Sequence, residues 1–182
     1  GQVRSDSRTA DESVNRVLDQ KAKFLGRGND GLAFDTGDGH VVKVGSDVGF
    51  HWNNGIRPPG EGSARTKQTA ELNNMLRSQG VPGLLNHEVI EHDGRTFLKM
   101  PKLTIPDKFT QEQLTQVTNT VKALHAKGYA IGEGKTMECL LYRSSDRGRS
   151  WEKMGPVFDS KPFYVKGCDY PVEHAPDVSV VY

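Results

Sequence analysis

Three glycines and one lysine are the first residues whose types and spacing suggest chemistry. Gly26, Gly28 and Gly31 form a Gly-x-Gly-x-x-Gly pattern, and Lys43 follows in the next apolar run. Because glycine has no Cβ, backbone N–H groups in such a loop can approach phosphate oxygens closely. A lysine pointing inward from a strand would meet the same phosphates, although a buried ammonium group needs a carboxylate partner. The alternatives are a flexible turn and a solvated strand lysine.

Carboxylates further along the chain are candidates for that partner, for a metal and for proton transfer. Glu71 lies in a segment with helical spacing, Glu133 and Glu138 lie five residues apart, and Asp159 ends a short apolar run. Carboxylate oxygens are ligands for Mg²⁺, and a positioned carboxylate can accept a proton. Each is equally compatible with an ordinary solvated or turn carboxylate. Two other aspartates are weaker candidates for the metal: Asp146 and Asp169.

The apolar periodicity predicts the elements that would position these residues. Helices are predicted over 11–23, 64–78 and 110–127. Strands are predicted at 24–25, 32–34, 41–44, 84–91, 95–100, 139–142 and 156–158, with a loop over 45–63. Asp11 or Ser13 would cap the first helix, and Thr110 with Gln113 forms a capping box for the last. The glycine loop therefore joins two strands, whereas a dinucleotide-binding loop opens a helix.

Composition narrows the class of protein. The chain has 182 residues, of which 35% are hydrophobic and 26% are charged, with 24 Lys and Arg against 23 Asp and Glu. Collagenous, coiled-coil and disordered chains are excluded, and no nucleic-acid partner is expected. No apolar run approaches the roughly 20 residues of a membrane span, and no signal peptide is visible. Cys139 and Cys168 are the two cysteines, which favours a reducing, cytoplasmic compartment.

The stretch FLGRGNDGLAFDTGDGHVVKV resembles the glycine-rich loop and strand lysine of protein kinases. In that family a helix glutamate holds the lysine, which is the position of Glu71 here. Met100 ends a strand resembling the one that enters the hinge, where it would contact the nucleotide. Leu124-His125, followed by Gly128-Tyr129, resembles the segment before the catalytic loop. His125 itself we expect at a helix end, favourable to the helix dipole when protonated.

The resemblance covers about residues 20–165 and implies a two-lobed α+β fold. It divides the chain into an N-terminal helix or tail (1–20), a small antiparallel β lobe with one helix (21–102) and a reduced helical lobe (103–182). The residues after Asp159 are too few for the large helical subdomain of a full kinase. The chain is therefore expected to be a minimal, divergent kinase-like protein of the kind found among bacterial effectors and phage proteins, or a fragment.

The catalytic loop departs from the family pattern. Glu133 stands where the family has its aspartate base, and Glu138 stands where it has a metal-binding asparagine. Lys135 keeps the cation two residues after the base, and Asp159 is the candidate for the Mg²⁺-binding aspartate, without the usual Phe-Gly after it. A glutamate is one methylene longer than an aspartate, and a shift near 1 Å can lower the rate about 10²-fold.

The leading hypothesis is ATP- and Mg²⁺-dependent phosphoryl transfer to a protein substrate, in the cytoplasm or after delivery into a host cytosol. Gly26, Gly28 and Gly31 would cover the phosphates, with Lys43 beside them. The alternative is a pseudokinase that serves as a nucleotide-binding or structural interaction module. A third possibility keeps the phosphoryl or nucleotidyl chemistry and uses a small-molecule acceptor.

Overall fold

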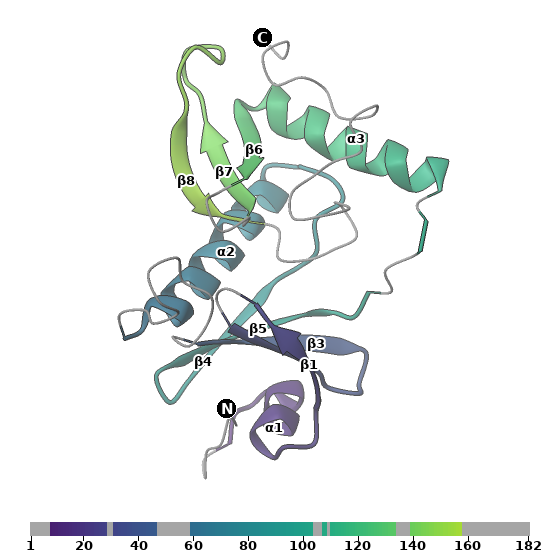
Figure 1. Cartoon of the computed structure of the whole chain (residues 1–182), viewed down its shortest axis with the longest axis vertical. Helices are drawn as coiled ribbons and strands as arrows, with labels where there is room; N and C mark the ends of the chain where they lie inside the picture. The colour runs from purple at the N-terminus through teal and green to yellow at the C-terminus, as the bar shows by residue number, and fades with distance from the viewer. Residues whose placement is uncertain are drawn as a thin grey trace. The chain divides into compact units, whose positions relative to one another are not determined.

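The computed structural model describes residues 8–28, 31–46, 59–103, 107–108, 110–133 and 139–157. This part of the chain has an α+β architecture with three helices, a five-stranded antiparallel sheet and a three-stranded sheet (Figure 1). It forms two compact units: Gly1–Ala70 with Asn86–Lys102, and Glu71–Leu85 with Leu103–Tyr182. Helix α2 (Glu61–Ser78) therefore contributes its first part to one unit and its last part to the other.

The first unit is organised around the five-stranded sheet. Its strands are β1 (Lys23–Arg27), β2 (Gly31–Asp35), β3 (His40–Gly45), β4 (Glu88–His92) and β5 (Arg95–Pro101). Every pair is antiparallel and the order is β1-β2-β3-β5-β4, so the first three predicted strands form an antiparallel meander. The strand predicted from residue 84 begins at Glu88, because the Leu85 carbonyl accepts a hydrogen bond from Asn73 Nδ2 at 2.7 Å and not from a strand.

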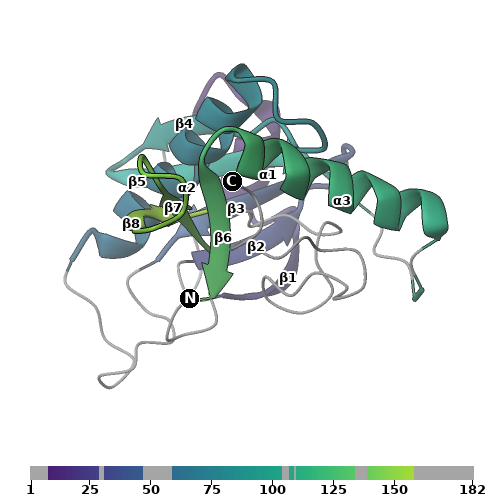
Figure 2. The same ribbon diagram turned by 90° about the horizontal axis from the view of Figure 1, so that it is seen from above.

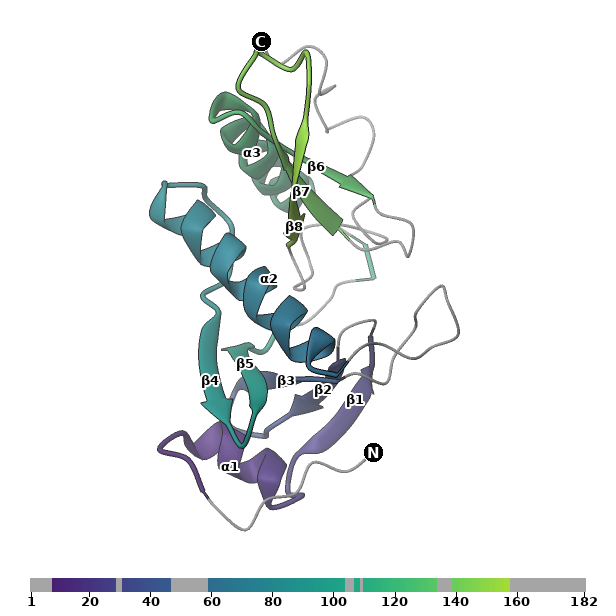
Figure 3. The same ribbon diagram turned by 90° about the vertical axis from the view of Figure 1, so that its left-hand side faces the viewer.

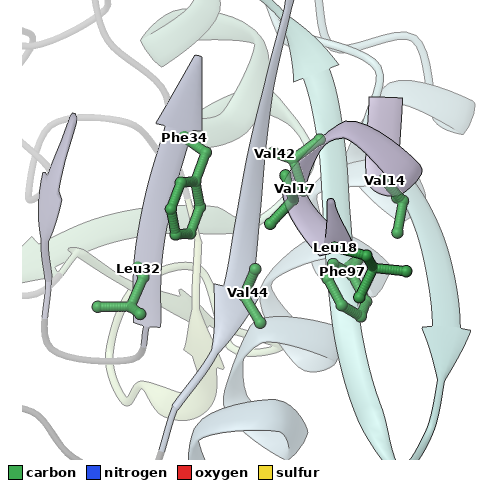
Figure 4. Packing of buried hydrophobic residues seen from close by; sticks show 8 residues of the cluster. All are labelled: Val14, Val17, Leu18, Leu32, Phe34, Val42, Val44 and Phe97. Carbon is green, nitrogen blue, oxygen red and sulfur yellow. The ribbon is translucent and has the colours of Figure 1, made fainter. Parts of the chain in front are cut away.

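Helix α1 (Glu12–Leu18) covers one face of this sheet. Asp11 caps it, as expected, by accepting a hydrogen bond from the Val14 N–H at 3.0 Å. The helix ends earlier than predicted, because Gln20 takes a positive φ of 57°. Figure 4 shows the apolar cluster between the helix and the strands, which consists of Val14, Val17, Leu18, Leu32, Phe34, Val42, Val44 and Phe97. Burial of these side chains is the main force that fixes α1 on the sheet.

The first part of α2 lies on the opposite face of the sheet (Figure 3). Ala70 packs there against Leu98 and Met100, which alternate along β5 with residues facing α1. The helix starts at Glu61 and not at 64. Gly62 allows this first turn to sit against β3, since a Cβ there would lie 1.9 Å from the Ser46 carbonyl oxygen. Most of the loop expected over 45–63 falls outside the described residues.

The second unit contains α3 and the smaller sheet. Its elements are α3 (Gln111–Ala126), β6 (Tyr129–Glu133), β7 (Cys139–Arg143) and β8 (Glu152–Pro156), in the strand order β6-β7-β8. The Thr110–Gln113 capping box is confirmed. Figure 2 shows α3 turning directly into β6. The shared core comprises Leu76, Val81, Leu124, Tyr129, Leu141 and Val157.

The sequence predicted a reduced helical lobe here, with strands only at 139–142 and 156–158. The structure adds a third strand, β6. Its backbone pairs residue by residue with β7, from Tyr129 with Arg143 to Glu133 with Cys139. The last strand, β8, also lies earlier than the predicted 156–158. None of the helices in the described part of the chain combines the length and apolarity that crossing a bilayer requires.

Candidate functional site

The glycine loop joins the two outermost strands on one side of the larger sheet. Gly28 donates its N–H to the Gly31 carbonyl at 2.9 Å, which closes the connection between β1 and β2. A register shift between Phe24 and Gly26 places a bulge just before the loop, and Gly26 pairs with Ala33. The two residues between Gly28 and Gly31 lie outside the described residues. The loop thus connects antiparallel strands, as predicted from the sequence.

The three glycines have different surroundings. A Cβ on Gly31 would lie 2.0 Å from the Val44 carbonyl oxygen, so packing alone requires glycine there. A Cβ on Gly26 would meet nothing within 4 Å, and one on Gly28 would meet only the Gly31 oxygen at 4.0 Å. Neither of these two glycines is therefore required by packing. Their lack of a side chain leaves the backbone open to a ligand, which is what a phosphate group needs for close approach.

Lys43 lies in the same cross-strand row as the first glycine of the loop. Its neighbours Val42 and Val44 face α1, so alternation along β3 turns the half-buried Lys43 to the other face. It pairs with Ala33 on β2, which in turn pairs with Gly26 on β1. Neighbouring strands lie about 4.8 Å apart, so the Lys43 backbone is about 10 Å from Gly26, within reach of an extended lysine side chain and one phosphate group.

Two apolar side chains complete this face beside Lys43. Leu98 pairs directly with Lys43 and is fully buried, and Met100 is 6% exposed two residues further along β5. Both side chains pack against Ala70 of α2, so the helix covers this apolar part of the face. Contact between Met100 and a nucleotide stays a prediction.

Glu71 lies on the exposed side of α2. The buried residues of the helix form one stripe. The periodicity of 3.6 residues per turn places this stripe on the side opposite Glu71. These residues are Gly62, Thr66, Thr69, Ala70, Asn73 and Leu76. The ion pair between Glu71 and Lys43 stays a prediction, and the stripe gives it no support.

Of the predicted catalytic and metal-binding residues, only the backbone of Glu133 lies within the described part of the chain. Glu133 is the last residue of β6, with its backbone paired to Cys139, and its side chain lies outside the described part. Lys135, Glu138 and Asp159 also lie outside it. Within the described residues no group of three His, Cys, Asp or Glu side chains is arranged to hold a metal ion. The roles of these four residues therefore stay predictions.

Two residues weighed in the sequence have structural roles in the second unit. Asp146, a weak metal candidate, accepts hydrogen bonds from Ser144 and Ser150 within a turn. His125 was expected to favour the dipole at the end of α3 as a cation, but it is only 4% exposed, and burial lowers its pKa. Its place in the last turn of α3 is as expected, while desolvation disfavours the imidazolium form that would interact with the dipole.

Nothing in the residue pattern indicated that Ala33 and Leu98 would flank Lys43. The signal that could have found Ala33 is its position two residues after Gly31, which puts both on the same face of β2. The position of Leu98 beside Lys43 depends on the pairing of β3 with β5, which brings together segments far apart in the chain.

Comparison with known proteins adds no family: no protein-family model matches this chain, and no curated protein matches it.

Proposed function

We propose that this chain binds ATP with Mg²⁺ and transfers a phosphoryl group to a protein substrate, as a minimal kinase-like domain. The observation that carries the proposal is the row across the sheet from Gly26 through Ala33 to Lys43. It combines an open glycine backbone and an ammonium group on one face, the combination that binds nucleotide phosphates in protein kinases. The kinase-like assignment rests on this row together with the sequence resemblance.

The order of elements supports the same proposal. Three antiparallel strands with the glycine loop at their start are followed by α2 and then by the β4–β5 hairpin. This is the order that the resemblance to kinases implies for the small lobe. After the sheet come α3 and β6, and the segment resembling a catalytic loop runs from Glu133, the last residue of β6, to Glu138, just before β7.

The proposed chemistry uses few groups. Lys43 would balance the negative charge of the phosphates, and the N–H groups of the glycine loop would hold their oxygens. Asp159 and Glu138 would hold Mg²⁺, which neutralises charge on the transferred group. Glu133 would accept the proton of the substrate hydroxyl. The hydroxyl oxygen would then bond to phosphorus as the bond to the leaving ADP breaks. Lys135 would stabilise the charge on the transferred group.

Calorimetric titration of ATP with Mg²⁺ tests the binding step. We expect the wild type to bind and Lys43→Ala to lose at least about tenfold in affinity, since a charge-assisted contact to phosphate is lost. Lys67→Ala is the matched control, because Lys67 is an exposed lysine on α2 and its loss changes the net charge equally. Absence of binding by the wild type, or equal losses in both variants, would overturn the proposal.

Two observations favour the pseudokinase alternative. Glu133 and Glu138 stand at positions where active kinases have Asp and Asn. Glu71 lies on the exposed side of α2. Transfer of radiolabelled phosphate to a mixed protein substrate, or to the chain itself, separates the two hypotheses. Transfer that disappears in Glu133→Ala while ATP binding persists supports the enzyme. ATP binding without transfer supports the pseudokinase.

A further inference from the structure

The connection between β7 and β8 is a turn organised by a single carboxylate. Asp146 Oδ1 accepts hydrogen bonds from Ser144 Oγ at 2.8 Å and from the Ser150 N–H at 2.9 Å, and its Oδ2 accepts one from Ser150 Oγ. Ser144 Oγ also accepts the Gly148 N–H at 2.7 Å. The side-chain and backbone hydrogen bonds from Ser150, followed by the one from Ser144, lower the pKa of Asp146 to about 2. Asp146 is therefore ionised at neutral pH, the form that can accept all of these hydrogen bonds.

Arginine side chains project from this turn. Arg147 has a φ of 59°, a left-handed conformation that is unfavourable for a side chain of this size. Arg147 and Arg149 are exposed in the turn, and Arg143 is exposed at the end of β7, where Glu152 is its cross-strand partner. Among the described residues, no ion pair joins a carboxylate to any of the three. A surface loop without a function would gain by relaxing Arg147 or replacing it with glycine. Strained backbone that presents a charged group is typical of binding loops.

A hollow of about 400 Å³ lies at the end of the hairpin where β7 and β8 meet the turn that joins them. It is lined by Arg143, Ser145, Ser150, Trp151 and Glu152. Its size is in the range of ligand sites in proteins, roughly 300–1,000 Å³. The lining offers a cation, hydroxyl groups, an indole and one carboxylate in a small space. In Figure 1 the hairpin that carries it extends away from α3.

We propose that this hairpin is a docking site for an acidic segment of a partner protein. Arginine forks bind carboxylates through paired hydrogen bonds. Arg143 lines the hollow, and Arg147 and Arg149 are exposed in the adjoining turn. A peptide also carries backbone N–H groups for Glu152 and apolar atoms for Trp151. Docking on this surface requires no nucleotide, so the inference is independent of the proposed phosphoryl transfer.

Charge favours a peptide over a nucleic acid. Glu152 lines the hollow, and its carboxylate can accept a hydrogen bond from a peptide amide, a donor that the sugar–phosphate backbone of DNA lacks. Binding to a duplex or a single strand also uses a broad basic surface, whereas this chain has a formal net charge of only +1.

Fluorescence anisotropy of a short labelled peptide alternating Glu and Ser tests the proposal. We expect Arg147→Ala/Arg149→Ala to weaken binding about tenfold or more, since two charge-assisted contacts are lost. Lys108→Ala/Lys122→Ala is the matched control, with the same change in net charge at two exposed lysines of the same unit. Equal weakening by both double variants would overturn the proposal, as would tighter hairpin-dependent binding of an oligothymidylate of equal charge.

A second variant separates a preorganised site from a diffuse positive charge. Asp146→Asn makes the hairpin more positive, so simple attraction predicts tighter peptide binding. The proposal predicts binding weaker by about threefold or more, because the turn loses its organising charge and the arginines lose their fixed spacing. An unchanged circular dichroism spectrum controls for folding. Tighter binding would refute the docking site as described.

The location of binding is read from Trp151. In a Trp52→Phe background it is the only tryptophan, since the chain has two. A peptide seated in the hollow would change the emission of Trp151 with the same midpoint as the anisotropy titration. Binding by anisotropy without any change in emission would place the peptide elsewhere and contradict the proposal.

Discussion

Replacing Gly31 by alanine should destabilise the first unit through a single backbone clash. The added Cβ would lie 2.0 Å from the Val44 oxygen, 2.9 Å from the Val44 carbonyl carbon and 3.3 Å from the Gly45 Cα. These are backbone atoms of β3, so no side chain can rotate to relieve the contact. Gly31 pairs with Gly45 in the ladder, and a shift that relieves the clash disturbs the end of that ladder.

The size of the effect follows from known overpacking variants. Inserting a methyl group into a packed region costs about 1–3 kcal/mol, and an immobile backbone neighbour favours the upper part of that range. For a chain of 182 residues, each kcal/mol lowers the melting temperature by about 2–4 °C. Gly31→Ala should therefore melt about 2–12 °C below the wild type. Thermal and urea unfolding followed by circular dichroism would measure both quantities.

Gly28→Ala is the matched control in the same loop. The nearest atom to its added Cβ is 4.0 Å away, so stability should change by less than about 0.5 kcal/mol. The same variant should weaken ATP binding, because the methyl group occupies the space that a phosphate oxygen would use. A Gly31→Ala protein as stable as the wild type would refute the packing argument. Equal destabilisation by both variants would refute the distinction between the two glycines.

Three further predictions concern stability. Lys99 and Asp11 form an ion pair at 2.9 Å with side chains 18% and 13% exposed, so Lys99→Met should lower the free energy of unfolding in urea by about 1–2 kcal/mol. Lys102→Met, which removes a lysine that is 51% exposed, should cost less than about 1 kcal/mol, and the reverse order would contradict this ranking. His125 has a lowered pKa, so the unfolded chain takes up its proton from about pH 6.5 downward while the folded chain does not. Stability should fall below about pH 6.5 more steeply for the wild type than for His125→Gln, and parallel pH profiles would show that burial of His125 is not responsible. Leu18→Ala should cost about 2–5 kcal/mol, because Leu18 is 5% exposed in the cluster under α1, and a loss below 1 kcal/mol would mean that α1 is not held by packing.

Local backbone chemistry explains which parts of the fold the sequence predicts well. The caps at Asp11 and Thr110 were recognisable because each depends on residues three positions apart in the chain. Strand β6 was not recognisable, since Gly132 is a weak strand former. It is held by pairing with β7, and the absence of a side chain at Gly132 makes room for the Tyr142 ring, 2.8 Å from where a Cβ would lie.

The orientation of α2 was hidden for a different reason. Its buried stripe is largely polar, with Thr66, Thr69 and Asn73 each at most 2% exposed. Apolar periodicity cannot detect such a stripe, because it counts these residues as exposed. Asn73 Nδ2 donates to the Leu85 carbonyl and Thr69 Oγ1 donates to the Arg65 carbonyl, and only the folded structure reveals these partners.

Where packing alone explains why a residue is of its type, that type is no independent evidence of function. This criterion divides the candidate residues of both units into two groups. Gly31 is required by the Val44 carbonyl, and Asp146 is required by its turn, so neither needs a ligand to account for it. Gly28 is glycine where any residue would fit, and Arg147 is arginine where glycine would be less strained. These two residues gain nothing for the fold from their identities. Selection for binding is the simplest explanation of both, which is why the phosphate and acidic-peptide experiments are centred on them.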